Sequence, residues 1–362
     1  MSVRSTWLRL GGGVLVGALL VAVVAGCSSG QPASSTGSTS TAPAKKTVKT
    51  AMVTDIGGLG DKSFNDLSNA GLQEAAKQLA VKTQVLESKS AADYESNLTN
   101  LANAGYNPIF AVGFLMQDTV SKMSTAFPDV TFGGIDESFS PGIPNVVGLD
   151  FKEQEGAYLA GYLAAKLTTL PSVDGRINDK PILGFVGGVN IPPVARYQAG
   201  FQAGAKAANP AVQVKSIMTG SFTDQQKGLE AGKALIGQGA DILFAAAGQT
   251  GLGTAKAAQD NKALFIGVDA DQFLTIPGIG DTIITSAVKK VDTAVFDTIK
   301  QANDGTLKGG QDVLYGLKED GVGLSPYHDW ETKVPADMKA AVEKAKADII
   351  AGTVTVPTTP AP

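Results

Sequence analysis

Residues Thr54 to Asp66 read TDIGGLGDKSFND, and this stretch decides which fold the chain can adopt. It follows a short apolar run, Val48 to Val53, and precedes a segment with the composition of a helix. Its glycines allow the backbone to turn sharply and to approach a ligand closely, since no Cβ stands in the way. A strand that ends in a glycine turn and opens a helix is where open α/β sheets bind small ligands. The alternative is a surface loop with a helix cap, since Ser63 and Asp66 fit a capping pattern.

The rest of the chain alternates apolar, strand-like runs with longer alanine-rich segments, which indicates parallel sheets covered on both faces. The second half also repeats the first. AGLQEAAK at 70–77 matches AGFQAGAK at 199–206, and FGGID at 132–136 matches FIGVD at 265–269. The matches keep the same order at a nearly constant offset, so the sequence predicts two lobes with the same βα topology.

This repeat places Asp136 and Asp269 at the ends of equivalent strands. If the lobes face each other by those ends, the two carboxylates line one cleft from opposite sides. They could accept hydrogen bonds from hydroxyl groups of a ligand, or serve as the acid pair of a glycosidase. For either residue alone, a cap on the following loop is the non-functional interpretation.

The N-terminus has the features of an export signal. Arg4 and Arg9 precede an uncharged apolar run at 11–25, which fits a signal peptide better than a membrane span. The run ends in VAGC, which resembles the lipobox of bacterial lipoproteins, where the chain is cut before the cysteine and the thiol is lipidated. Cys27 is the only cysteine. We therefore expect a signal peptide at 1–26 and a lipid anchor on Cys27, at the extracytoplasmic face of the cell membrane.

Two segments lack the large apolar residues that a core needs. Residues 27–46 are predicted to be a disordered tether and residues 353–362 a disordered tail. The intervening stretch of roughly 300 residues exceeds the usual size of one compact domain, which again favours two lobes.

Charge and composition exclude several function classes. The chain has 30 basic and 34 acidic residues and no basic cluster, so nucleic acid is not an expected partner. Its one histidine, His328, cannot supply a zinc site built from several histidines. We expect no metal and no cofactor.

Four motifs together resemble the basic membrane protein family of bacterial lipoproteins: DKSFN at 61–65, NVVGLDFKEQEGAYLAGYLAA at 145–165, GSFTDQQKG at 220–228 and IGVDADQ at 266–272. The resemblance covers about residues 48–352. It implies a substrate-binding protein of an ABC transporter, not an enzyme, with the purine nucleoside receptors as the best-known branch. It also implies the type I periplasmic-binding-protein fold, in which two doubly wound parallel-sheet lobes are joined by a three-crossover hinge.

The resemblance places the crossovers near Asp150, near Lys290 and at 315–321. The first lobe would then comprise residues 47–150 plus 290–315, and the second 151–289 plus 316–352. The final helix, within 336–352, would pack on the second lobe.

Family positions for the base of a nucleoside transfer to five residues. Phe64 and Phe222 match aromatics that stack on the two faces of the base, one from each lobe. Asn65 matches a residue at the edge of the base, where its amide offers a donor and an acceptor. Asp55 and Asp136 match first-lobe positions that accept from base N–H groups.

The sugar positions transfer to the second lobe. Asp269 matches a carboxylate that holds sugar hydroxyls, and Lys289 matches a cation beside them, with Lys290 as the neighbouring alternative. Gly248 would let the backbone approach the ribose. Arg196 aligns with a ligand arginine in sugar-binding relatives, although its helix also needs a polar face.

The leading hypothesis is therefore a lipid-anchored receptor that binds a purine nucleoside and presents it to an ABC permease, as a monomer. A sugar or another small metabolite, taken up or sensed, is the alternative within the same fold. A secreted hydrolase using Asp136 and Asp269 is a further alternative.

Overall fold

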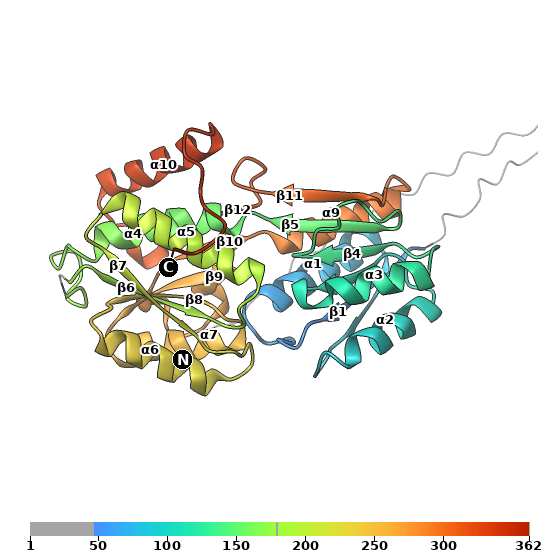
Figure 1. The fold of residues 1–362 in the computed structure, drawn as a ribbon, viewed down its shortest axis with the longest axis horizontal. Coiled ribbons are helices and arrows are strands. Elements are labelled where there is room, and N and C mark those ends of the chain that lie inside the picture. The colour runs from blue at the N-terminus through green and yellow to red at the C-terminus, as the bar shows by residue number, and fades with distance from the viewer. Residues whose placement is uncertain (1–46, 179, 362) are drawn as a thin grey trace, which may run out of the picture. The chain divides into compact units, whose positions relative to one another are not determined.

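The computed structural model describes residues 47–178 and 180–361. Cys27, the expected signal peptide and the expected tether lie outside these residues. Within them the chain forms two six-stranded sheets, each flanked by helices (Figure 1). We call the sheet that contains the strand after residue 48, with its helices, the first lobe, and the other sheet with its helices the second lobe.

The first sheet has the order β11-β5-β4-β3-β1-β2, and all its strand pairs are parallel. Its strands are β1 (Lys49–Thr54), β2 (Lys82–Leu86), β3 (Ile109–Val112), β4 (Phe132–Ile135), β5 (Val146–Phe151) and β11 (Gln311–Tyr315). Its helices are α1 (Phe64–Leu79), α2 (Asp93–Asn103), α3 (Gln117–Ala126) and α9 (Val291–Asp304). The central strands β3 and β4 are buried along their whole length, as their continuous apolar sequences predict.

The second sheet has the order β12-β10-β9-β8-β6-β7. Its strands are β6 (Ile182–Gly187), β7 (Gln213–Met218), β8 (Ile242–Ala246), β9 (Leu264–Asp269), β10 (Ile283–Lys289) and β12 (Val322–Leu324). Its helices are α4 (Glu153–Leu167), α5 (Pro192–Ala208), α6 (Gln225–Gly237), α7 (Gln249–Asp260), α8 (Gln272–Thr275) and α10 (Ala336–Ile350). The short edge strand β12 runs antiparallel to β10, and the other pairs are parallel.

The two sheets have equivalent strand orders, so β4 corresponds to β9 and β1 to β6. Asp136 follows β4 and Asp269 ends β9, and both have a left-handed backbone, with φ of 62° and 58°. The internal repeat in the sequence therefore reflects two lobes of the same α/β topology.

The chain passes between the two sheets three times. It crosses at Lys152, between β5 and α4, at Lys290, between β10 and α9, and at residues 316–321, between β11 and β12. Three adjacent connections of this kind form a hinge between the lobes.

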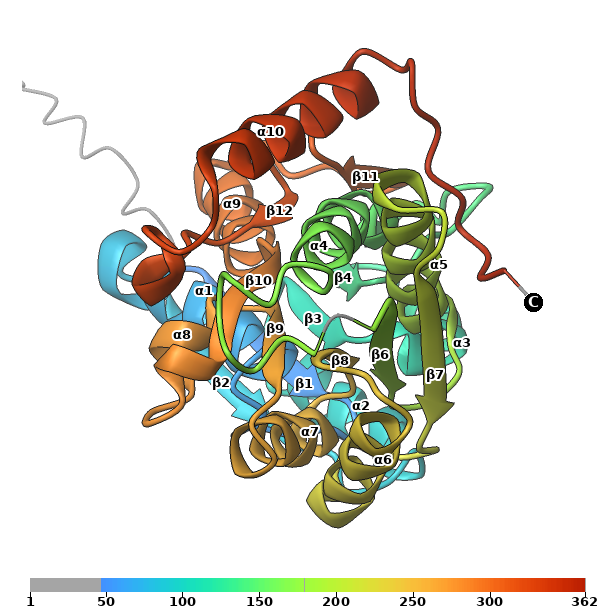
Figure 2. The ribbon, with the colours of Figure 1, turned by 90° about the vertical axis from the view of Figure 1, so that its left-hand side faces the viewer.

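Residues 353–361 differ from the predicted disordered tail. They run from α10 past α5 (Figure 2). Val356 is 8% exposed, and the N–H of Ala361 donates to Oε1 of Gln202 on α5 at 2.9 Å. One buried valine and a backbone hydrogen bond hold this segment, which its Thr- and Pro-rich composition does not indicate. The preceding helix α10 packs against α4. Among the described residues, no helix combines the length and the apolar character needed to cross a membrane.

Candidate functional site

A pocket lies between the two lobes, at the carboxyl ends of their strands, with about 530 Å³ of empty space including the part open to solvent. Every predicted site residue except Arg196 lines it. These residues are Asp55, Phe64, Asn65, Asp136, Phe222, Gly248, Asp269 and Lys289. The lining also includes residues that the sequence did not single out for the ligand, among them Asp61, Phe114, Ile191 and Tyr197.

The glycine turn after β1 builds the first-lobe end of this pocket. Asp55 Oδ1 accepts from the N–H of Gly57 at 2.8 Å and from Nδ2 of Asn65 at 3.0 Å. A Cβ at position 57 would lie 2.9 Å from that oxygen, so a larger residue there would have to displace the Asp55 carboxylate. Burial raises the pKa of Asp55 to about 6, against the lowering effect of these two hydrogen bonds.

Asp61 shapes the start of α1 and also lines the pocket. Its carboxylate accepts from the backbone N–H groups of Ser63, Asn65 and Asp66, at 2.8–3.1 Å. Ser63 stands at the N-cap position but makes no capping bond with its side chain. The side chain of Asp61 therefore satisfies the donors that an N-cap residue would otherwise serve.

Two phenylalanines face the pocket, one from each lobe. Phe64 opens α1, and its ring centroid lies 4.6 Å from Nζ of Lys289. Phe222 packs directly on Gly188, where a Cβ would come within 2.4 Å of the ring. Gly248, with a φ of 55°, brings its backbone beside Phe222, since a Cβ there would lie 3.0 Å from the Phe222 carbonyl oxygen.

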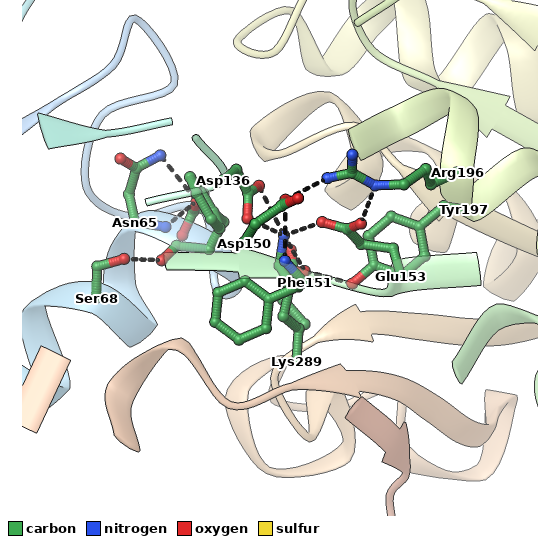
Figure 3. A network of polar contacts seen from close by, with 12 residues as sticks. Asn65, Ser68, Asp136, Asp150, Phe151, Glu153, Arg196, Tyr197 and Lys289 are labelled. Carbon is green, nitrogen blue, oxygen red and sulfur yellow. Dashed lines mark hydrogen bonds and ion pairs between the residues drawn. The ribbon is translucent and has the colours of Figure 1, made fainter. Parts of the chain in front are cut away.

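Lys289 is the centre of a buried charge network that joins the lobes (Figure 3). Its Nζ lies 2.8 Å from Asp136 Oδ2, 3.2 Å from Glu153 Oε1 and 3.7 Å from Asp269 Oδ1. Burial alone would lower the pKa of Lys289, but the carboxylates of Asp136, Glu153 and Asp269 outweigh it and raise that pKa. The lysine is therefore a permanent cation at this site.

Two carboxylates of the network, Asp136 and Asp269, have raised pKa values because they are buried. Burial raises the pKa of Asp136 to about 7 although Lys289 opposes the shift, and burial also raises the pKa of Asp269. The hydroxyl of Tyr197 donates to Asp269 Oδ1 at 2.7 Å, which fixes that carboxylate beside the pocket. Acids outnumber bases here, so donors from a bound ligand would relieve the excess of acceptors.

Lys290, the neighbouring alternative, points elsewhere. It forms an exposed ion pair with Asp320, whereas Lys289 is 2% exposed and lines the pocket. The structure therefore places Lys289, and not Lys290, at the cleft.

Arg196 does not line the pocket. Its guanidinium lies 2.7 Å from Asp150 and 2.5 Å from Glu153, at the end of α5 that faces the crossover after β5. Asp150 belongs to the first sheet and Arg196 to the second lobe, so this pair bridges the lobes (Figure 3). The carboxylates of Asp150 and Glu153 thus hold the Arg196 guanidinium between the lobes, outside the pocket.

Glu153 and Tyr197 are functional candidates that the sequence alone does not indicate. Glu153 is fully buried and binds both Lys289 and Arg196. In the sequence it is one of two acids in the first turn of a helix, a place where acids are common for reasons of the helix dipole. Tyr197 lies among apolar residues at helical spacing and therefore resembles a core residue.

Further hydrogen bonds close the lobes on each other around the pocket. Nε2 of Gln249, at the start of α7, donates to the carbonyl oxygens of Gly57 and Leu59 at 2.9 and 3.2 Å. The hydroxyl of Thr275 on α8 donates to the carbonyl oxygen of Lys62 at 2.9 Å. Both contacts join the second lobe to the glycine turn of the first.

Comparisons with known proteins agree with this architecture. Residues 48–359 match the family described as ABC transporter substrate-binding protein PnrA-like, Bmp. The ABC transporter nucleoside-binding protein BmpA of Lactococcus lactis is 34% identical over 355 residues, which are 93% of this chain and 95% of that protein. An uncharacterised lipoprotein of Pyrococcus abyssi is 36% identical over 320 residues, which are 85% of this chain and 75% of that protein.

A solved structure shows the same fold. The crystal structure of an ABC transporter solute-binding protein from Aeropyrum pernix K1 superimposes with a TM-score of 0.79 and 30% identity, and covers 86% of this chain and 93% of its own. The two α/β lobes described above are therefore those of a type I periplasmic solute-binding protein.

Proposed function

We infer that this chain, which belongs to the Bmp family of PnrA-like ABC transporter substrate-binding proteins, binds a purine nucleoside between its two lobes. Members of this family bind a small molecule for an ABC transporter and are not enzymes, so a hydrolase using Asp136 and Asp269 is set aside. We also propose that the chain acts as a monomer and carries a lipid anchor.

The observation that carries the proposal is the pairing of Phe64 and Phe222 across one pocket. Flat apolar rings from both lobes suit a planar base, because stacking between aromatic faces buries much surface. Beside them, Asp269 and Lys289 offer an acceptor and a cation to sugar hydroxyls. The name of the Lactococcus lactis relative, a nucleoside-binding protein, supports the same ligand class.

We propose that binding operates by closure about the three crossovers, with the first lobe moving against the second lobe. A ligand held by both lobes favours the closed arrangement, because that arrangement has the greater affinity for it. The permease would recognise the closed, loaded lobes.

Titration calorimetry with residues 28–362, the mature chain without its lipid-bearing Cys27, tests the ligand. The panel contains adenosine, guanosine, inosine, a pyrimidine nucleoside, the free bases, ribose and glucose. We expect purine nucleosides to bind most tightly. If only sugars bind, the base-stacking proposal is wrong and the chain is a sugar receptor.

A separate experiment tests the anchor. We propose that Cys27 carries the lipid and holds the receptor at the extracytoplasmic face of the membrane. Cys27→Ser should move the protein from the membrane fraction to the soluble fraction without changing the ligand affinity of the folded lobes. Retention of the variant in the membrane would remove Cys27 from this role.

A further inference from the structure

We propose that the first-lobe end of the pocket selects a base with two adjacent N–H donors, a guanine-type base, over adenine. The inference rests on the proposed nucleoside function and adds the identity of the base. It follows from which hydrogen-bonding atoms of Asn65 and Asp55 are already used within the protein.

The amide of Asn65 is fixed in one orientation. Its Nδ2 donates to Asp55 Oδ1 at 3.0 Å and to Asp61 Oδ2 at 3.2 Å. Two carboxylate oxygens can only face the NH₂ group, because an amide oxygen turned toward them would meet acceptors. Oδ1 of Asn65 is buried and accepts no hydrogen bond from the described residues. Asn65 therefore has an unused acceptor and no unused donor.

Asp55 presents the second acceptor. Both hydrogen bonds that its carboxylate receives go to Oδ1, from Gly57 and from Asn65. Oδ2 receives none from the described residues. Gly113, which also lines the pocket, leaves room beside Oδ2, since a Cβ there would lie 3.1 Å from it. Asp61 does not add to this set, because its oxygens already accept from Ser63, Asn65 and Asp66.

Side chains that offer only acceptors require a ligand edge that offers donors. The guanine edge carries N1–H beside the N2 amino group, so it can donate to both oxygens. Hypoxanthine has N1–H but lacks the amine, and adenine places its N6 amine beside the acceptor N1. A bound adenine would place its N1, which is an acceptor, against an acceptor oxygen of Asn65 or Asp55. A site whose buried acceptors need donors discriminates strongly against a ligand that lacks one.

The test compares guanosine, inosine, adenosine and 1-methylguanosine by calorimetry on the mature chain at pH 7.5. We expect guanosine to bind at least about tenfold more tightly than adenosine, with inosine between them, because an unpaired buried acceptor typically costs that much or more. 1-Methylguanosine, which lacks N1–H, should lose about tenfold relative to guanosine. This panel uses only the wild-type protein, so it tests the guanine preference even if a substituted protein fails to fold.

A matched pair of variants locates the effect. In Asp55→Asn the amide oxygen can keep the bonds from Gly57 and Asn65, while its NH₂ replaces Oδ2 and turns an acceptor into a donor. Guanosine affinity should fall at least about tenfold, and adenosine affinity should hold or rise. Asp66→Asn is the control, because Asp66 accepts from Gly60 and Lys62 in the same loop but does not line the pocket.

The outcomes separate this inference from the proposed function. Adenosine binding as tight as guanosine, or an unchanged guanosine-to-adenosine ratio in folded Asp55→Asn, would overturn the guanine preference and leave nucleoside binding intact. Failure of every purine nucleoside to bind, with a sugar binding instead, would overturn both.

Discussion

Nζ of Lys289 donates to both carboxylate oxygens of Asp136, at 3.0 and 2.8 Å, from the second lobe to the first. The lysine is 2% exposed and the aspartate 6%, so the pair is buried where the lobes meet. Glu153 adds a third charge to this contact, at 3.2 Å from the same nitrogen. A buried ion pair of this kind need not raise stability, but removing one partner leaves an uncompensated charge.

Lys289→Met should therefore be strongly destabilising, because Asp136 and Glu153 lose their common cation. We expect a loss of about 3–5 kcal/mol in the free energy of unfolding, measured by urea denaturation, together with a loss of ligand binding. Lys290→Met is the matched control, since Lys290 forms an exposed pair with Asp320 whose contribution should be under about 1 kcal/mol. Equal effects of the two substitutions would contradict the buried role of Lys289.

Gln249 is expected to act on affinity and not on stability. Its Nε2 bonds to Gly57 and Leu59 form only when the second lobe meets the glycine turn. Gln249→Ala should weaken nucleoside binding about fivefold or more, because two hydrogen bonds of about 0.5–1.5 kcal/mol each are lost from the closed state. Gln259→Ala is the control, since Gln259 Nε2 donates to Gly278 within the second lobe at 2.8 Å. A similar loss in both variants would show that the Gln249 contact is not specific to closure.

Phe222→Ala should weaken nucleoside binding by about 1–3 kcal/mol, the range for a base stacked on an aromatic side chain. The free energy of unfolding must be measured for the same variant, because Phe222 is 9% exposed and packs on Gly188. Ribose binding, if detectable, serves as the reference, because a sugar alone does not use the stacking face. Unchanged nucleoside affinity in the folded variant would remove Phe222 from the site.

The sequence could predict the residues that follow strands. Asp136 and Asp269 occupy matching places in the repeat, and the structure gives both the same left-handed backbone at the edge of one pocket. Asp55 and Asn65 were assigned to the ligand by the resemblance to family positions, and they lie on either side of a glycine turn between a strand and a helix. Strand ends meet at one edge of a parallel sheet, so residue order alone brings these side chains together.

Residues on helices could not be placed in the same way. Arg196 and Tyr197 are neighbours on α5, yet Tyr197 reaches the pocket and Arg196 reaches Asp150. The rotation of α5 depends on its close packing against α4, where a Cβ at Gly200 would lie 2.1 Å from the carbonyl oxygen of Gln154. That contact belongs to the tertiary structure, and the sequence alone does not show which helix α5 meets.

The charge network around Lys289 could not be predicted from the sequence for a related reason. Glu153 and Lys289 are 136 residues apart, and each is a common residue type for its local position. Only the packing of α4 beside the end of β10 makes them partners. Long-range ion pairs of this kind cannot be inferred from one sequence without the fold.

The last prediction concerns pH and the ligand-free protein. Burial raises the pKa of Asp55 from an ordinary value near 3.8 to about 6 in the folded state. The folded protein therefore holds this proton at pH values where the unfolded chain has released it. The contribution of Asp55 to the free energy of unfolding is therefore fully present below about pH 4 and is lost as the pH rises through 6. For a pKa shift of this size, the loss is up to about 3 kcal/mol.

The measurement that isolates this group is the difference between wild type and Asp55→Asn in the free energy of unfolding, followed from pH 4 to pH 7.5. An asparagine does not titrate, so the wild type should lose stability relative to the variant as the pH rises through this window. Asp66→Asn provides the baseline for a loop carboxylate outside the pocket. A difference between wild type and Asp55→Asn that is constant over the whole range would show that Asp55 does not titrate there, and the raised pKa would have to be abandoned.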